Sequence, residues 1–214
     1  SYEAAETLSQ VTLDSLLLQR AGFDKPRPDQ NKNYWLNLLG FRVPETSQDY
    51  SLVTLPKMEL RQLGASLHSR PILLTQTGRI FIDNGRMKSA NRQDYLLFGS
   101  TQGVLHVVDV QGKEVLAFVP YEMMERQKQA FLSEDSSMGG VQKLFYGIDA
   151  PWTARSQYVT SKDGTLTVND TMRQTQDQQR GLLSSRGMQW VYGGLRMGGR
   201  SYYSLDLTDL TRPV

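Results

Sequence analysis

The chain is predicted to be mainly β: a partial, modified β-propeller of antiparallel blades, with a helical N-terminal segment and one inserted helix. Short apolar runs recur at even spacing between Leu96 and Pro120, and glycine-containing turns separate them. Both alternating faces of the middle run, Val104–Val108, are mainly apolar, which is typical of a strand covered on both sides, as propeller blades are. We expect a helical and irregular segment over residues 1–62 and the first blades, truncated, over residues 63–214.

Two short helices are expected in residues 1–62. Val11–Arg20 places leucines at helical spacing, and the glycine that follows would end that helix. Tyr34–Leu39 is the second candidate, with Asn31 or Asn33 as its cap and Gly40 at its end. The proline-containing stretch between them disfavours regular structure.

Strands dominate from Leu63 onward. A hairpin is expected around Thr77-Gly78, joining Pro71–Gln76 to Arg79–Asp83, and Asn84–Asp94 is expected to be a basic loop. A three-strand unit follows, with turns at residues 101–103 and 110–112. Its strands are Leu96–Ser100, Val104–Asp109 and Glu114–Val119.

The second half of the chain contains the inserted helix and further strands. Pro120 suits the start of a helix over Tyr121–Leu132, whose apolar stripe is Met123, Met124, Ala130 and Phe131. The Asp163-Gly164 pair is typical of a hairpin turn, here between Tyr158–Ser161 and Thr165–Val168. The remaining expectations are a loop at Ser133–Gly140, a long exposed loop at Asn169–Arg186, and strands at Met188–Gly193 and Ser201–Leu207.

Composition narrows the classes of function. The 214 residues include 24 basic and 22 acidic side chains, for a net charge of +2, and no cysteine. Because the arginines and lysines are scattered, no nucleic-acid partner is expected. The absence of any apolar run of about 18 residues predicts no transmembrane segment. A chain without cysteine has no disulfide and no thiolate site.

Motifs of catalysis and metal binding are scarce. His68 and His106 lie in no metal-binding spacing, and a structural hydrogen-bonding role is expected for His106. Neighbouring residues such as His68-Ser69 do not establish the geometry of a catalytic triad. The glycine-rich run Gly193–Arg200 lacks the ending of a phosphate loop, and Asp83–Asp94 lacks the alternation of a calcium loop. No catalytic, cofactor-binding or metal-binding residue is therefore predicted.

Four blocks of sequence resemble, in order, the C-terminal β-propeller of the PilC/PilY family, the type IV pilus-associated tip adhesins and biogenesis proteins. The first is LGASLHSRP at residues 63–71 and the second is LFGSTQGVLHVVD at residues 97–109, which continues through Pro120 into the following helix. The third is YGIDAPW at residues 146–152, and the fourth is QWVYGGLRMGGRSYYSLDLTD at residues 189–209. The family motif residues are expected to have structural roles: Gly99, Gly103, His106, Asp109, Pro120, Tyr146, Asp149, Trp152, Trp190, Gly193, Gly194, Gly198, Gly199, Tyr203 and Asp206.

The resemblance implies a non-enzymatic protein, exported to the periplasm, the outer membrane surface and the pilus tip. Its propeller would support pilus assembly, oppose retraction in twitching motility, and contribute to adhesion and virulence. The implied partners are minor pilins or pilus tip subunits and a host-cell or abiotic surface. The family's calcium loop would lie beyond Leu205–Asp209, so no cofactor is assigned to this chain and calcium is left to the full-length protein.

Exposed loops of the scaffold are the candidate contact surfaces, namely Asn84–Gln93 with Arg86, Lys88 and Arg92, and Asn169–Arg186 with Arg173 and Arg180. Two alternatives stay open at this point. A quinoprotein-type dehydrogenase propeller is suggested by Val107–Phe118, although Leu116 stands where the repeat of those enzymes has tryptophan. A generic protein-binding propeller is the other alternative.

Overall fold

The computed structural model describes residues 31–47, 64–66, 68–132, 145–169, 173–177 and 181–214. The predictions for Val11–Arg20 and Ser133–Gly140 lie outside these residues. The described helices are α3 (Lys32–Leu38), α4 (Tyr121–Gln127), and the 3-10 helices η1 (Lys128–Phe131) and η3 (Arg196–Gly198). The strands are β1 (Ile72–Asp83), β2 (Arg86–Gly99), β3 (Leu105–Asp109), β4 (Glu114–Phe118), β5 (Thr153–Gln157), β6 (Val159–Thr160), β7 (Thr165–Thr167), β8 (Arg173–Asp177), β9 (Gly181–Ser185), β10 (Met188–Gly194) and β11 (Tyr202–Asp206).

The predicted three-strand unit is confirmed as β2, β3 and β4, which pair as an antiparallel meander. Gly103 and Gly112 have φ angles of 99° and 81° in the two turns, a conformation that favours glycine. The Asp109 side chain accepts the backbone N–H groups of Gln111 and Lys113, both at 2.9 Å, and so closes the second turn. The two turns therefore connect the three strands as tight hairpins.

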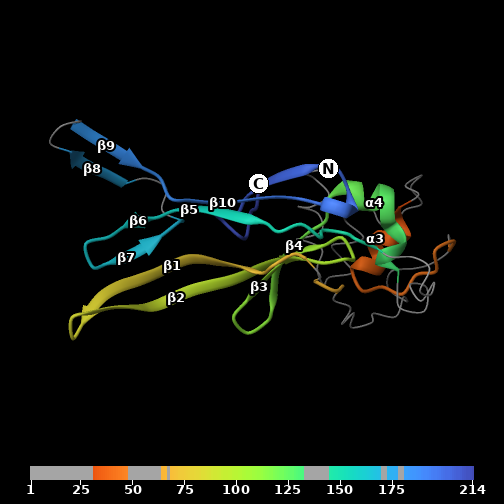
Figure 1. The fold of residues 1–214 in the computed structure, drawn as a ribbon, viewed down its shortest axis with the longest axis horizontal. Coiled ribbons are helices and arrows are strands. Elements are labelled where there is room, and N and C mark those ends of the chain that lie inside the picture. The colour runs from red at the N-terminus through yellow and green to blue at the C-terminus, as the bar shows by residue number, and fades with distance from the viewer. Residues whose placement is uncertain (1–30, 48–63, 67, 133–144, 170–172, 178–180) are drawn as a thin grey trace.

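β1 and β2 form one long ribbon that projects away from the helices (Figure 1). The predictions of a hairpin at Thr77-Gly78 and of a loop at Asn84–Asp94 were wrong. Thr77-Gly78 lies inside β1, where the register against β2 shifts, as it does at a β-bulge. The turn is Asn84-Gly85 instead, with φ angles of 49° and 72°, because a two-residue hairpin turn needs positive φ at both positions.

β1 and β2 belong to a six-stranded sheet of order β4-β3-β2-β1-β7-β6. The predicted hairpin around Asp163-Gly164 is confirmed as β6 and β7. A second sheet has β10 between β5 and β11, which confirms the two C-terminal strands. β5 was missed because all five of its residues are exposed, so that it shows no apolar alternation.

β8 and β9 pair with each other as a separate hairpin, which projects from the same end of the molecule as the β1–β2 ribbon (Figure 1). The expectation of a loop over Asn169–Arg186 was therefore wrong. The sequence of the segment is polar and aperiodic, so that it gave no strand signal, and backbone pairing defines the two strands.

One hydrophobic cluster joins the helices to both sheets. The predicted helix at Tyr34–Leu39 is confirmed as α3, whose Trp35 ring stacks on Phe131 with centroids 6.3 Å apart. The stripe predicted after Pro120 is also confirmed, since Met123, Met124, Ala130 and Phe131 are buried. The α-helix ends earlier than expected, at Gln127, and continues as the 3-10 helix η1.

The six-stranded sheet has two unlike faces. Leu105 and Val107 of β3 are each 1% exposed on the face that meets the core. On the other face His106 is buried, whereas the paired residues Leu73 and Leu96 are 54% and 42% exposed. The mainly β prediction with antiparallel sheets is confirmed, and across the described residues the sheets do not close into a barrel or ring. None of the helices in these residues is long and apolar enough to span a bilayer.

Candidate functional site

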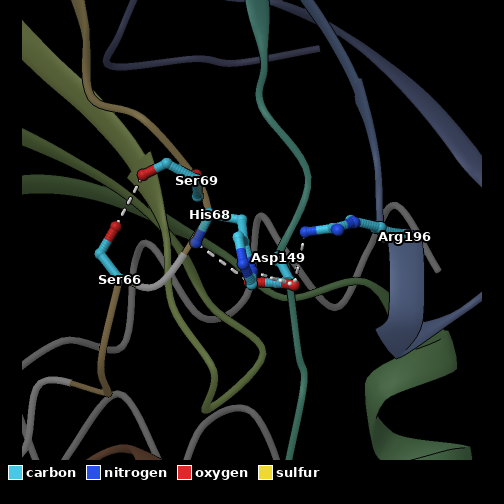
Figure 2. A network of polar contacts seen from close by, with 5 residues as sticks. All are labelled: Ser66, His68, Ser69, Asp149 and Arg196. Atoms are coloured by element: carbon cyan, nitrogen blue, oxygen red, sulfur yellow. Dashed lines mark hydrogen bonds and ion pairs between the residues drawn. The ribbon is translucent and has the colours of Figure 1, made fainter.

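The Asp149 carboxylate is the centre of a polar network at the junction of the two sheets (Figure 2). It accepts the backbone N–H of His68 at 3.2 Å and lies 2.9 Å from His68 Nδ1. Arg196 Nη1 lies 3.5 Å from the same carboxylate. The Asp149 side chain is 1% exposed, whereas those of His68 and Arg196 are 57% and 50% exposed. The half-exposed side chains of His68 and Arg196 thus cover one buried carboxylate.

Neighbouring contacts hold the members of this network in place. Ser69 Oγ accepts the N–H of Gly99 at 2.7 Å, and Ser66 Oγ donates to the Ser69 carbonyl at 2.7 Å. The Ile148 N–H donates to the Ser100 carbonyl at 3.0 Å, which ties the Asp149 segment to the end of β2. We call Ser66, His68, Ser69, Asp149 and Arg196 the Asp149 joint.

The chemistry of the Asp149 joint is that of a structural tie. A His–Asp pair orients an imidazole in hydrolases, where the imidazole then serves a neighbouring nucleophile. Here the adjacent Ser69 hydroxyl faces Gly99 on β2 and engages its N–H rather than the His68 ring. A buried carboxylate is stable only when it is paired and hydrogen-bonded, and this one gains its partners from segments 81 and 47 residues away.

Glycines of the motif blocks allow these blocks to approach one another closely. A Cβ atom at Gly99 would overlap the Ile148 carbonyl, and one at Gly193 would overlap the Trp152 ring. A Cβ at Gly198 would likewise overlap the carbonyl of Gly147. The second, third and fourth blocks of the resemblance therefore pack directly on each other, which sequence order alone did not show.

The other motif residues also lie in structural positions. His106 Nδ1 lies 2.5 Å from a Glu114 carboxylate oxygen, and its ring stacks on Phe98. Three motif glycines lie close to side chains: Gly103 to Met123, Gly194 to the Tyr202 ring and Gly199 to Glu122. Two aromatic motif residues contact other rings, with Trp190 stacked on Tyr192 and Tyr203 edge-on to Phe118. Pro120 is the N-cap of α4, and the Asp206 side chain accepts the Thr208 N–H at 2.9 Å. Tyr146 is half-buried, next to the Asp149 segment.

A second buried polar cluster, which no sequence pattern predicted, lies between the two sheets. Gln76 Nε2 donates to Gln189 Oε1 at 2.9 Å and to the Leu207 carbonyl at 2.7 Å. Gln189 Nε2 in turn donates to Ser156 Oγ at 3.0 Å. Both glutamines are almost fully buried, at 3% and 0% exposure. Gln76 lies between Thr75 and Thr77, where the register of β1 against β2 shifts, so that it is itself the extra residue of a bulge.

The predicted contact residues lie on hairpins rather than on loops. On the β1–β2 ribbon, Lys88 forms an ion pair with Asp83 at 2.5 Å, and Arg92 Nε lies 2.8 Å from an Asp94 carboxylate oxygen. The hydrogen bond from Arg92 holds the pKa of Asp94 below its ordinary value of 3.8, helped by the Thr75 hydroxyl and opposed by partial burial. Arg173 is the first residue of β8, and Arg180 lies outside the described residues.

Within the described ranges, no three His, Asp or Glu side chains gather as metal ligands would. Comparisons of the chain with protein-family models, with curated proteins and with solved structures found no match.

Proposed function

We propose that this chain is a non-enzymatic scaffold of the type IV pilus that supports pilus assembly, opposes retraction and contributes to adhesion. One observation carries the proposal: three of the sequence blocks that resemble the PilC/PilY family pack on one another at the junction of the two sheets. Their glycines and Asp149 serve this packing, as Gly99 against Ile148 and Gly193 against Trp152 illustrate. The residues that carry the resemblance are therefore ones whose small size or hydrogen bonding this packing needs.

The proposal includes a propeller of which these sheets are a part. The four strands β1 to β4 pair in chain order, as the strands of a blade do, and their outer face carries the exposed pair Leu73 of β1 and Leu96 of β2. An apolar outer face is what a blade needs in order to pack against a neighbouring blade. Export to the periplasm and outer surface belongs to the same proposal, as do minor pilins or tip subunits and a host-cell or abiotic surface as partners.

The scaffold would make its contacts through the two hairpins that project from the same end of the molecule (Figure 1). A core with projecting hairpins suits recognition, because the core fixes where the hairpins stand relative to a partner. Of the contact residues predicted from sequence, Arg86, Lys88 and Arg92 belong to one hairpin and Arg173 to the other.

The test is carried out in the bacterium that encodes the chain. Its gene is deleted and then restored with an affinity-tagged wild-type copy, and surface pili, twitching and co-purified minor pilins are measured. We expect deletion to abolish or sharply reduce surface pili and twitching, and the tagged protein to capture minor pilins after cross-linking. Normal piliation together with no captured pilin would contradict the proposal and favour a generic protein-binding propeller.

A second assay addresses the quinoprotein alternative. The purified protein is mixed with the quinone cofactor, and absorbance and reduction of a redox dye are followed with alcohol and sugar substrates. We expect no dye reduction above that of the free cofactor. Substrate-dependent reduction would contradict a non-enzymatic role.

A further inference from the structure

The distal part of the β1–β2 ribbon, residues 79–90, has an open strand edge; we call this part the β1–β2 arm. β3 pairs with β2 only from Tyr95 to Gly99. From Arg86 to Asp94 no described strand lies on the outer side of β2, while β1 occupies its inner side. An open edge of this kind is a template for another strand.

The register of the β1–β2 arm shows which backbone groups face outward. A two-residue turn makes its flanking residues, Asp83 and Arg86, a hydrogen-bonded pair, and such pairs then alternate along the arm. Arg86, Lys88 and Ala90 therefore bond to β1, whereas the N–H and C=O groups of Met87 and Ser89 point away from it. The Ile80 N–H agrees with this alternation of hydrogen-bonded and non-hydrogen-bonded pairs. It points away from its cross-strand neighbour Ser89 and donates to the Gly164 carbonyl at 2.9 Å.

The two faces of the β1–β2 arm differ in chemistry. One face carries Ile80, Ile82, Met87 and Ser89, with Ile82 and Met87 both 77% exposed and Ile80 42% exposed. This face leads into a groove of about 260 Å³ that Ile80, Ser89, Tyr158 and Leu166 help to line. The opposite face carries three cations, Arg79, Arg86 and Lys88, with one carboxylate, Asp83, which pairs with Lys88, and with the half-buried Phe81. The arm is thus apolar on one face and cationic on the other.

We propose that the outer edge of β2 on the β1–β2 arm receives an extended segment of a partner protein in which apolar and acidic residues alternate. A strand paired with Met87 and Ser89 continues both faces of the arm, because successive side chains of a strand point to opposite sides. Its apolar residues then lie beside Met87, and its carboxylates lie beside Arg86 and Lys88. A cationic segment would place like charges beside Arg86 and Lys88, and a uniformly apolar segment would leave them without carboxylate partners.

The inference rests on the proposed function, for which it names a contact surface and the chemistry of the partner segment. The mode is strand addition, in which backbone hydrogen bonds supply affinity and the alternating side chains supply specificity.

The probe is a fluorescently labelled ten-residue peptide of alternating valine and glutamate, titrated with the whole chain and followed by fluorescence anisotropy. We expect saturable binding, and no binding of a valine–lysine peptide or of a peptide with the same composition in two blocks. Binding of the valine–lysine peptide with equal affinity would overturn the proposal, as would failure of the valine–glutamate peptide to bind.

Three variants test the geometry. Ser89→Pro removes an outward N–H that β1 does not use, and we expect it to weaken binding by about tenfold or more. The double change Arg86→Glu with Lys88→Glu should weaken it by a similar factor, whereas Lys162→Glu, an exposed cation on the β6–β7 turn, should leave it unchanged. Wild-type affinity in both Ser89→Pro and the double variant would overturn the proposal.

Three further outcomes separate the competing explanations. A concentration-dependent dimer that Ser89→Pro dissolves would assign the edge to a second copy of this chain and overturn the proposal. Capture of pilins with no peptide binding would overturn this inference while leaving the proposed function standing. Peptide binding without pilin capture would support the inference and count against the pilus assignment.

Discussion

At the scale of single residues, Asp149 is the point at which three distant segments meet. Asp149→Asn removes the charged acceptor of His68 and Arg196 while keeping the size of the side chain. We expect the free energy of unfolding to fall by about 1.5–3 kcal/mol, the range for hydrogen bonds to a charged group. Urea denaturation followed by tryptophan fluorescence measures the change. Glu125→Gln, the same chemical change at an exposed position of α4, is the control and should have little effect.

Adjacent glycines of β10 provide a second matched pair. A Cβ atom at Gly193 would overlap the Trp152 ring, whereas at Gly194 the nearest atoms are 3.5 Å away, an ordinary contact distance. Gly193→Ala should therefore lower the free energy of unfolding by about 1–3 kcal/mol, the usual cost of overpacking. Gly194→Ala should cost much less, and equal losses in thermal denaturation would show that the contact with Trp152 is not the cause.

The sequence indicated some of these structural roles, but not which residues contact one another. The apolar strand around His106 favoured a structural role for that residue, whereas the structural role of the motif glycines was implied by the family resemblance. In the structure His106 contacts Glu114, and several motif glycines lie where a Cβ atom would overlap a neighbour. The pairing of His68 with Asp149 spans 81 residues, and that of Gln76 with Gln189 spans 113. No periodicity or spacing rule connects residues so far apart, because the packing of two sheets decides which of them meet.

At the scale of elements, the base of the β1–β2 ribbon should make stability depend on pH. The hydrogen bond from Arg92 lowers the pKa of Asp94 in the folded chain below the ordinary 3.8. A lowered folded pKa adds stability that is fully present above the ordinary value and is lost as pH falls through the folded value. Wild type should therefore exceed Asp94→Asn in free energy of unfolding at pH 6, and the difference should shrink below about pH 4. Urea denaturation across pH 2.5–6 measures it, and a constant difference would contradict the assignment.

The ribbon also shows how an element can be misread. Gly78 indicated a turn, but a glycine inside a strand also marks a bulge. Gly78 stands opposite two residues of β2, Asn91 and Arg92, so that it faces the bulged part of the partner strand. The Asn84-Gly85 pair was the stronger hairpin signal in the sequence. The charged residues after it masked the strand, because an exposed two-stranded ribbon is held by cross-strand pairing and needs no buried face.

At the scale of the whole molecule, the mainly β architecture followed from turn spacing and alternation, whereas the assembly of the sheets did not. The three-strand unit is local: each of its strands pairs with the next along the chain. The placement of β5 beside β10 joins residues 31 to 39 positions apart, and exposed Thr153–Gln157 gives no apolar signal for it. Closure of a propeller is a still longer-range property, and it stays a prediction.

The last prediction concerns whether α3 belongs to the same folding unit as the sheets. Trp35 is 7% exposed, stacks on Phe131 and belongs to the cluster that contains Leu74 and Val191 of the two sheets. Trp35→Ala should therefore lower the free energy of unfolding of the whole chain by about 3–5 kcal/mol, the cost of removing a buried aromatic side chain. Trp35→Phe should recover part of this loss, and Tyr202→Ala, at an 88% exposed position, should cost almost nothing.

Calorimetry distinguishes the two arrangements of the chain. If α3 shares the core, the Trp35→Ala chain unfolds in one transition at a lower temperature, because removing a contact inside a cooperative unit destabilises all of it. If residues before the sheets formed a unit of their own, the variant would show an early, small transition followed by a second one at the wild-type temperature. The second pattern would separate α3 from the scaffold that the two sheets form.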